Sequence, residues 1–327
     1  MLRRSLVLAA LLVALVAATV CSLAFGAVKL PFSEVVDILF GNGGSEAQRQ
    51  IVETLRLPRT VEALVVGAAL SVAGAVLQGA LGNPLASPDV IGVTGGAGFG
   101  AILIIILLPG SIALLPLAAL AFGLLAAALV FVFAWSGRNR GSTGKVILAG
   151  IAMLSLFTAG TTGLLAAFPE RAPSAIFFIA GGLTSSGWEE IETIWPYFAV
   201  GFVFALFLIR PLDRLALGDD VAASLGSRPQ LIRLGAGIAA ALLAAASAAI
   251  AGLLGFLGLV VPHVVRMAGG TSSNTYVIPV SAIGGAALLA AGDTLARTLR
   301  APIEMPVGPF MVVLGVPLFL WLLRKAV

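Results

Sequence analysis

Long stretches without any charged side chain dominate the pattern of apolar and polar positions along this chain. They cover residues 5–28, 63–88, 90–137, 146–169, 193–209, 234–265, 267–292 and 305–323. A helix that crosses the hydrocarbon core of a bilayer needs about 20 predominantly apolar residues, so each run is long enough for one or two crossings. The pattern predicts an all-α polytopic membrane protein, with residues 1–327 forming a single transmembrane domain.

Two of these runs are too long for one crossing. The segment 108–111, Leu-Pro-Gly-Ser, is expected to divide the run 90–137 into two spans. In the run 234–265, the helix-breaking residues are Gly252, Gly255, Gly258 and Pro262. They indicate one span that ends near Ala251 and a second, broken one from about residue 256. We therefore expect about ten transmembrane helices.

The most polar interruption between apolar runs lies in residues 77–100, LQGALGNPLASPDVIGVTGGAGFG. The residues that cannot continue a regular helix are Asn83, Pro84, Ser87, Pro88 and Asp89. Non-helical backbone at membrane depth persists only where protein or water satisfies its polar groups, so this segment is expected to lie beside a path through the protein. Small residues recur every fourth position at Gly92, Gly96 and Gly100. They are expected to let a neighbouring helix approach closely.

Composition agrees with the hydropathy pattern. Hydrophobic residues make up 60% of the chain and charged residues 10%, and the mean hydropathy is +1.11, which is the composition of an integral membrane protein. Residues 2–25 have the basic start of a cleaved signal peptide. Their apolar run exceeds the 7–15 residues usual for a signal core, which favours a retained first helix. The single cysteine, Cys21, has no partner for a disulfide within the chain.

The distribution of charges predicts an orientation, because cytoplasmic loops carry an excess of Lys and Arg. With ten spans and the N-terminus inside, twelve of the 19 basic residues fall in inner segments: Arg3, Arg4, Arg138, Arg140, Lys145, Arg210, Arg214, Arg228, Arg233, Arg266, Arg324 and Lys325. The inner segments hold four acidic residues: Asp89, Asp213, Asp219 and Asp220. Most other acidic residues, including Glu62, fall in outer segments. Both termini are therefore expected to be cytoplasmic.

Several motifs resemble nucleotide or metal sites but lack residues that such sites need. The glycines of residues 96–101 resemble a dinucleotide-binding turn but begin a membrane span, and residues 141–145 resemble a phosphate loop but are followed by Val146 where Ser or Thr should hold magnesium. His263 is the only histidine, so a two-histidine metal site is impossible. No basic run with interleaved aromatic residues indicates nucleic acid. We expect no catalytic residue, no metal site and no bound cofactor.

Two further features depend on local spacing. Asp293 ends an apolar run, where an acid is costly and usually paired, and Arg297 lies one helical turn further on. The longest inner loop, residues 210–233, contains a predicted short helix that starts at Asp219 and Asp220 and ends at Gly226. Its apolar stripe and its lack of a basic face favour docking into a partner protein over lying on the lipid surface.

Nearly the whole chain resembles the membrane permeases of ABC importers for vitamin B12, ferric siderophores and haem (FecCD-like, type II importers). The matching segments are residues 55–59 (LRLPR), 79–92 with the core Asn-Pro-Leu-Ala, 217–226, 255–266 (GFLGLVVPHVVR) and 292–297 (GDTLAR). One departure is Gly292, where many relatives have Ala. The resemblance implies a homodimeric permease of the bacterial inner membrane. Two cytoplasmic ATPase subunits, which use ATP and Mg, and one periplasmic substrate-binding protein would be its partners.

The resemblance also implies roles for particular residues. Those expected to couple the permease to the ATPase are Asp219, Asp220, Val221, Ala223, Leu225 and Gly226. The binding protein is expected to dock on Arg56, Arg59 and Arg297, and the arginine fork suits bidentate carboxylate binding. The candidates for the cytoplasmic gate of the path are Asn83, Leu85, Ser142 and Thr143.

Three classes of function remain in order of preference. An ABC permease comes first, an ion-coupled secondary transporter second, and a membrane enzyme third. The lining residues, mostly Ala, Gly, Leu and Val, do not distinguish haem, a ferric siderophore and cobalamin as the cargo.

Overall fold

The structure is a computed structural model that describes residues 2–26, 28, 30–136, 142–183, 187–301 and 303–326. In these ranges the regular secondary structure is helical. The α-helices are α1 (Leu2–Ala24), α2 (Phe32–Leu39), α3 (Glu46–Arg49), α4 (Leu57–Leu81), α5 (Val93–Leu107), α6 (Leu115–Ala134), α7 (Thr143–Ala167), α8 (Ala172–Ala180), α9 (Trp188–Leu215), α10 (Asp219–Ser224), α11 (Pro229–Ala251), α12 (Leu257–Gly269), α13 (Asn274–Thr298) and α14 (Val307–Ala326). The shorter helical segments are η1 (Gln50–Arg56), η2 (Pro88–Ile91), η3 (Pro109–Leu114) and η4 (Pro169–Arg171).

Membrane-spanning helices account for most of the fold. Within the described ranges, seven helices are long and apolar enough to cross a bilayer: Leu2–Ala24, Glu46–Leu81, Pro109–Ala134, Gly144–Ala167, Trp188–Leu215, Pro229–Ala251 and Asn274–Thr298. Three shorter apolar helices are Val93–Leu107, Leu257–Gly269 and Val307–Leu320. The predicted all-α polytopic membrane fold is confirmed, and the figure of ten crossings stays a prediction.

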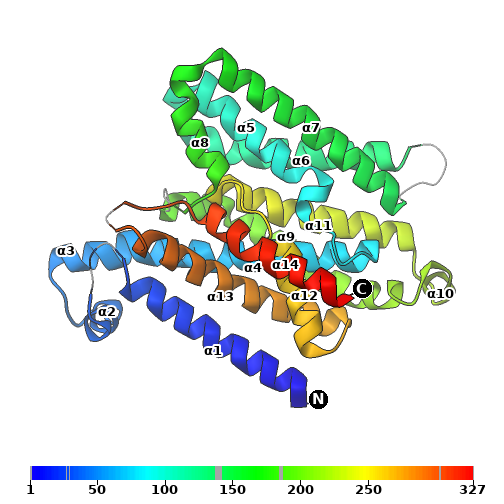
Figure 1. Cartoon of the computed structure of the whole chain (residues 1–327), viewed down its shortest axis with the longest axis horizontal. Helices are drawn as coiled ribbons and strands as arrows, with labels where there is room; N and C mark the ends of the chain where they lie inside the picture. Colours follow the sequence, from blue (N-terminus) through cyan, green and yellow to red (C-terminus); the bar gives the residue numbers. More distant parts are fainter. Residues whose placement is uncertain are drawn as a thin grey trace.

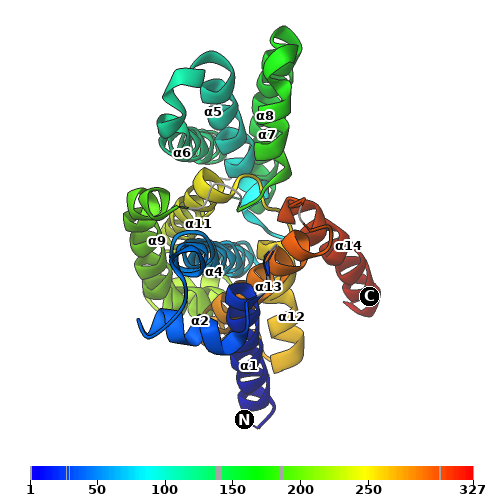
Figure 2. The same cartoon turned by 90° about the vertical axis from the view of Figure 1, so that its left-hand side faces the viewer.

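Helix α4 lies at the centre of the bundle. It packs against α9, α11, α12 and α13, and Figure 2 shows these helices arranged around it. The closest approach is at Gly74, where an added Cβ atom would lie 1.8 Å from the carbonyl oxygen of Gly258 on α12. Small residues at such crossings let helices pack backbone against backbone in a membrane. The position of α4 therefore depends on glycine at this crossing.

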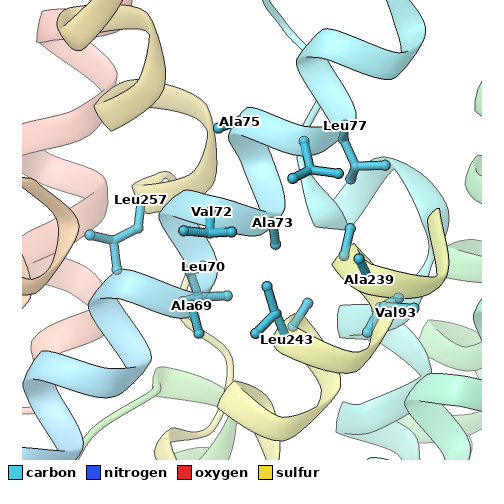
Figure 3. Packing of buried hydrophobic residues seen from close by; sticks show 14 of the residues in the cluster. Ala69, Leu70, Val72, Ala73, Ala75, Leu77, Val93, Ala239, Leu243 and Leu257 are labelled. Atoms are coloured by element: carbon cyan, nitrogen blue, oxygen red, sulfur yellow. The ribbon is translucent and has the colours of Figure 1, made fainter. Parts of the chain in front are cut away.

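The core around α4 is built from small and branched apolar side chains. Figure 3 shows Ala69, Leu70 and Ala73 of α4 beside Leu243 of α11, with Leu257 at the start of α12. Alanine dominates the facing surface of α11, which keeps the two helices close. Dispersion contacts between closely packed small residues are a main source of helix association where lipid replaces water.

Helices α5 to α8 form a second group on one side of this bundle (Figure 1). Cβ atoms added at Gly96 and Gly100 would lie 2.4 and 2.5 Å from carbonyl oxygens of α6, so the predicted close packing at these two glycines is confirmed. At Gly92 a helix also approaches closely, since an added Cβ atom would lie 3.4 Å from the carbonyl oxygen of Gly150 on α7, but the prediction that all three glycines share one face was wrong. Gly92, whose φ is +71°, ends η2 and begins α5, and its nearest neighbours are on α7 rather than α6.

The two helix breaks predicted inside the long apolar runs are present. Helix α5 ends at Leu107, before η3 and the start of α6. Helix α11 ends at Ala251, and α12 begins at Leu257 after an irregular connection. Phe256 in that connection has a φ of +68°, which is uncommon for a residue with a side chain. Both breaks follow from the local sequence.

The helices give the molecule two distinct ends. Helix α1 begins and α14 ends on the same side as α10, whereas α2 and α3 lie at the opposite end (Figure 1). We call these the α10 end and the α2–α3 end. At the α10 end, the Arg3 guanidinium donates to the carbonyl oxygens of Met267 at 2.7 Å and Ala268 at 2.8 Å. These carbonyls end α12, where a cation is favourable.

Candidate functional site

The loop between α9 and α11 folds into the short helix α10 at the α10 end. Asp219 and Asp220 occupy its first turn, where negative charge complements the helix dipole. At its other end Gly226 has a φ of +76°. The Gly226 amide donates to the carbonyl oxygen of Ala223 at 2.9 Å, and the Ser227 amide donates to that of Ala222 at 3.0 Å. This pair of bonds is the Schellman arrangement that ends a helix at glycine, so the predicted start and end of α10 are confirmed.

One face of α10 is apolar and exposed. Val221 and Leu225 retain 46% and 54% of their accessible surface, whereas Ala222 is fully buried and belongs to the main apolar core. The predicted amphipathic character of this helix is therefore present. Exposed branched residues on a rigid, capped helix can enter a groove on another protein, and which protein binds there stays a prediction.

Helix α9 is tied to α13 immediately before this loop. The Asp213 carboxylate accepts hydrogen bonds from the backbone amides of Asn274 at 2.6 Å and Thr275 at 3.3 Å. It also accepts from the hydroxyls of Ser273 at 3.2 Å and Thr275 at 2.7 Å. These groups form the N-terminus of α13, whose first amides lack partners inside the helix. Asp213 thus fixes the point from which the loop leaves the bundle.

Helix α11 is tied to the first residue of α10. The Arg233 guanidinium donates through Nη1 and Nη2 to the two carboxylate oxygens of Asp219, at 2.8 and 2.7 Å, and through Nε to the carbonyl oxygen of Ala80 at 3.2 Å. The Arg233 hydrogen bonds hold the pKa of Asp219 below its usual range. This bridge could not be predicted from spacing along the chain, because the partners of Arg233 come from two separate elements.

A hollow of about 480 Å³ opens beside this bridge at the α10 end. Its lining residues include Asn83, Pro84, Asp219, Arg233 and Arg266, so the segment after α4 and the start of α10 border the same space. The predicted gate residue Asn83 therefore lies close to the predicted coupling helix.

The other predicted gate residues have different surroundings. The Asn83 side chain accepts a hydrogen bond from the Leu85 amide at 2.9 Å, a local turn typical of asparagine. Leu85 is exposed. Ser142 is exposed and precedes the first residue of α7, and it is not among the residues that line the hollow. The side chain of Thr143, like Arg138 and Arg140 used for the orientation, lies outside the described residues.

The charge count assigned Asp89 to a polar inner loop, but the structure folds this residue back against the bundle. Its carboxylate accepts hydrogen bonds from the hydroxyls of Thr94 and Ser87. With Ser247 and Phe256 it borders a cavity of about 10 Å³, room for roughly one water molecule. Residues 83–92 therefore do not form a simple surface loop.

At the α2–α3 end, Arg59 lies inside the protein. Its Nη2 atom lies 2.9 Å from Oδ1 of Asp293, and its Nε atom lies 3.0 Å from Oδ2. Its Nη1 atom lies 2.6 Å from a carboxylate oxygen of Glu304. The Asp293 side chain is 1% exposed and that of Glu304 is 40% exposed. Arg59 therefore joins α4 to α13 and to the connection after it.

Arg56 and Arg297 complete this group of buried cations, which we call the arginine cluster together with Arg59. Arg56 donates to the carbonyl oxygens of Leu23 and Ala24, both at 2.8 Å, and so caps the end of α1. Arg297 donates to the Ser22 hydroxyl at 2.9 Å. Its predicted pairing with Asp293 is present, at 3.7 Å between Nε and Oδ2, but Arg59 makes the closer contact.

All three residues of the arginine cluster are buried, with exposures between 3% and 8%. The family resemblance implied that they are docking residues at an outer surface, but each already binds groups of its own chain. Their role in docking stays a prediction. In this structure Glu304 is the exposed member of the network to which Arg59 belongs.

Comparison with known proteins extends over almost the full chain. Residues 13–325 match the FecCD transport family. The chain is 36% identical over 320 residues to the Fe(3+)-citrate import system permease protein YfmE of Bacillus subtilis, covering 98% of this chain and 94% of that protein. It is 37% identical over 326 residues to the hemin transport system permease protein HmuU of Yersinia pestis, covering 98% and 96%. A solved structure described as an inward-facing metal-chelate type ABC transporter matches with a TM-score of 0.85 and 32% identity, covering 97% of this chain and 98% of that one.

Proposed function

This chain belongs to the FecCD transport family and is a multi-pass protein of the bacterial inner membrane, and from that premise we propose that it is the permease subunit of an ATP-driven importer. Its cargo would be a metal chelate: haem, a ferric siderophore or cobalamin. The observation that carries the proposal is the family match over residues 13–325, together with the exposed apolar face of α10. Relatives named for ferric citrate and hemin support this class of cargo.

The proposed assembly contains two copies of this chain, two ATPase subunits and one substrate-binding protein. Ten spans would place both termini and α10 in the cytoplasm, and the common position of the start of α1, the end of α14 and α10 supports this topology (Figure 1). The permease itself would hold no cofactor and perform no catalysis. ATP and Mg would be bound and used by the ATPase subunits.

Helix α10 is the proposed coupling element. Val221 and Leu225 would enter a groove of the ATPase, with Asp219, Asp220, Ala223 and Gly226 shaping the helix around them. Support comes from the capped geometry of α10 and the exposure of its apolar face. A rigid helix held at both ends of its loop can transmit a displacement, because its own conformation does not absorb the movement.

The proposed gate at the cytoplasmic end of the path uses Asn83, Leu85, Ser142 and Thr143. The hollow that Asn83 shares with Asp219 supports a gate near the coupling helix. A path that receives cargo from a high-affinity binding protein needs weak interactions, because tight binding in the path would slow release.

Docking of the binding protein is proposed at the arginine cluster of Arg56, Arg59 and Arg297. Because these side chains already bind Asp293, Glu304 and backbone carbonyls, a docked carboxylate would have to exchange with an existing partner. Glu304 is the best candidate for that exchange, since its side chain is the exposed one of the two carboxylates that bind Arg59.

Transport by a reconstituted complex tests the proposed function. Proteoliposomes that contain the permease, its ATPase and its binding protein should take up one of ferric citrate, a ferric hydroxamate, haem or cobalamin only when ATP is supplied. A non-hydrolysable ATP analogue is the control. Uptake driven by an ion gradient without the ATPase would overturn the proposal in favour of an ion-coupled secondary transporter.

Co-purification of the ATPase tests the role of α10. Val221→Asp places a charge on the exposed apolar face and should abolish co-purification while the permease stays folded. Gln230→Asp, an exposed position in the first turn of α11, introduces the same charge outside α10 and should leave co-purification unchanged. Intact co-purification of Val221→Asp would refute the assignment of α10.

A further inference from the structure

Arg233 joins two segments to which separate roles are proposed. Its three donor atoms make three hydrogen bonds, two to the carboxylate of Asp219 and one to the carbonyl oxygen of Ala80. Asp219 is the first residue of α10, and Ala80 lies in the last turn of α4. One planar group thus contacts both the coupling helix and the end of the central helix.

The Ala80 carbonyl is a natural acceptor for such a bridge. It is one of the last four carbonyls of α4, which have no amide partner within the helix. Gly82 follows with a φ of +59°, and Asn83 comes next. A displacement of the Ala80 carbonyl therefore acts on the backbone that leads directly into Asn83, the residue that borders the hollow.

Helix α11, which carries Arg233, is not free to move with α10. Arg233 lies in the second turn of α11, whose buried face packs along α4 and α9. Between α10 and α11 there are only residues 225–228. If α10 moves relative to the bundle, the Asp219–Arg233 ion pair must therefore either be distorted or move with α10, because Arg233 itself is held on α11.

We propose that Arg233 is a positioning residue that transmits the displacement of α10 to the end of α4 and so to the gate segment at Asn83. This inference rests on the proposed function, in which the ATPase moves α10. Arginine suits the task because its fork binds a carboxylate bidentately and leaves Nε for a third acceptor. A lysine ammonium is a single point of charge and cannot hold this geometry.

We expect the fold to persist without this pair. The Arg233 side chain is 19% exposed, but that of Asp219 is 53% exposed, and ion pairs open to solvent contribute little to stability. Substitution of Arg233 should therefore leave the permease folded and should separate ATP hydrolysis from transport. That separation is the readout that a purely structural role would not produce.

The experiment measures cargo transported per ATP hydrolysed by the reconstituted complex, together with co-purification of the ATPase. Arg233→Met keeps the length of the side chain but removes all three donors. We expect co-purification and ATP hydrolysis within twofold of the wild-type values, and at least a fivefold loss of cargo per ATP. Arg233→Lys should recover only part of that loss.

Arg214→Ala is the matched control. Arg214 is an exposed cation in the last turn of α9, and its guanidinium donates to the Ser227 hydroxyl at 3.3 Å rather than to α4. This variant should keep the wild-type cargo-to-ATP ratio. The double variant Asp219→Asn/Arg233→Met should lose no more cargo per ATP than Arg233→Met alone, because both substitutions break the same ion pair.

The outcomes separate the two proposals. If wild-type complexes show no ATP-driven uptake, the proposed function itself fails. If wild-type complexes transport and Arg233→Met keeps the full cargo-to-ATP ratio, the bridge is refuted while the proposed function stands. Equal losses of hydrolysis, co-purification and transport would also refute the bridge, since they would indicate a structural role for Arg233.

Discussion

Arg59 and Asp293, which are 234 positions apart in the chain, form a bidentate ion pair inside the protein. The contact joins the beginning of α4 to the last third of α13, and Asp293 is almost completely buried. A buried carboxylate without a cation is costly, so each residue of the pair offsets the cost of burying the charge of the other. The pair fixes the relative height of two neighbouring helices at the α2–α3 end.

Replacing Arg59 alone should strongly destabilise the permease. Arg59→Met leaves Asp293 buried without its closest cation, and loss of one partner from a buried pair costs about 3–5 kcal/mol. Thermal unfolding of the purified permease in detergent measures the effect. The double variant Arg59→Met/Asp293→Leu should recover only part of the loss, because Asp293 also pairs with the buried Arg297.

An exposed pair provides the control for this measurement. Arg171 and Glu170 lie 3.8 Å apart with side chains 42% and 63% exposed. Glu170→Gln, which removes the charge of the more exposed partner, should change the free energy of unfolding by less than about 1 kcal/mol. If Arg59→Met changed the free energy of unfolding by as little, the buried pair would not hold the helices together.

Glu304→Gln should strengthen docking of the binding protein. The substitution weakens the exposed partner of Arg59 and frees one edge of the guanidinium for an incoming carboxylate, a charge-assisted contact. We expect about a three- to tenfold gain in affinity, or roughly 0.7–1.4 kcal/mol. Titration of the reconstituted permease with the binding protein at low and high salt measures it, and the gain should shrink at high salt.

Glu170→Gln tests whether the gain is only an effect of net charge. It removes the same charge from the segment before α8 without touching Arg59. Affinity should stay close to that of the wild type. Equal gains in the two variants would argue against docking at the arginine cluster. Arg59→Glu is a poor test, because it would place two carboxylates together in the interior.

Gly74→Ala should separate α4 from α12. The new methyl group would lie 1.8 Å from the Gly258 carbonyl oxygen, and backbone cannot move aside as a flexible side chain can. Overpacking of this kind costs about 1–3 kcal/mol, which should appear as a lower unfolding temperature. Gly144→Ala is the control, because no atom of the described residues lies within 4 Å of its added methyl group. A wild-type melting temperature for Gly74→Ala would contradict the close crossing.

The role of Arg233 should not depend on pH near neutrality. Its hydrogen bonds lower the pKa of Asp219 below the usual carboxylate range, so the ion pair is present above that range and is lost only as the pH falls below about 4. The ratio of cargo per ATP between Arg233→Met and wild type should therefore be constant from pH 6 to 8. A difference that disappears toward pH 6 would point to another titrating group.

The sequence by itself determined the features that depend on neighbouring residues. The length of each uncharged run set the membrane-spanning helices, because about 20 apolar residues cross a bilayer. The glycines and prolines near Ala251 and Leu108 set the breaks, which appear where they were predicted. Helix α10 was also predictable, since its acidic first turn and the glycine at Gly226 are local signals for a helix start and end.

Only the tertiary structure decided where the charged side chains point. Arg59 looked like a surface residue in the sequence, yet it binds Asp293 and Glu304 within the protein. Asp89 looked like part of a loop and instead borders a cavity of the bundle. Spacing along a helix revealed the Asp293–Arg297 pair because i and i+4 share a face. It could not reveal the bridges made by Arg59 and Arg233, because their partners meet only after distant helices have packed.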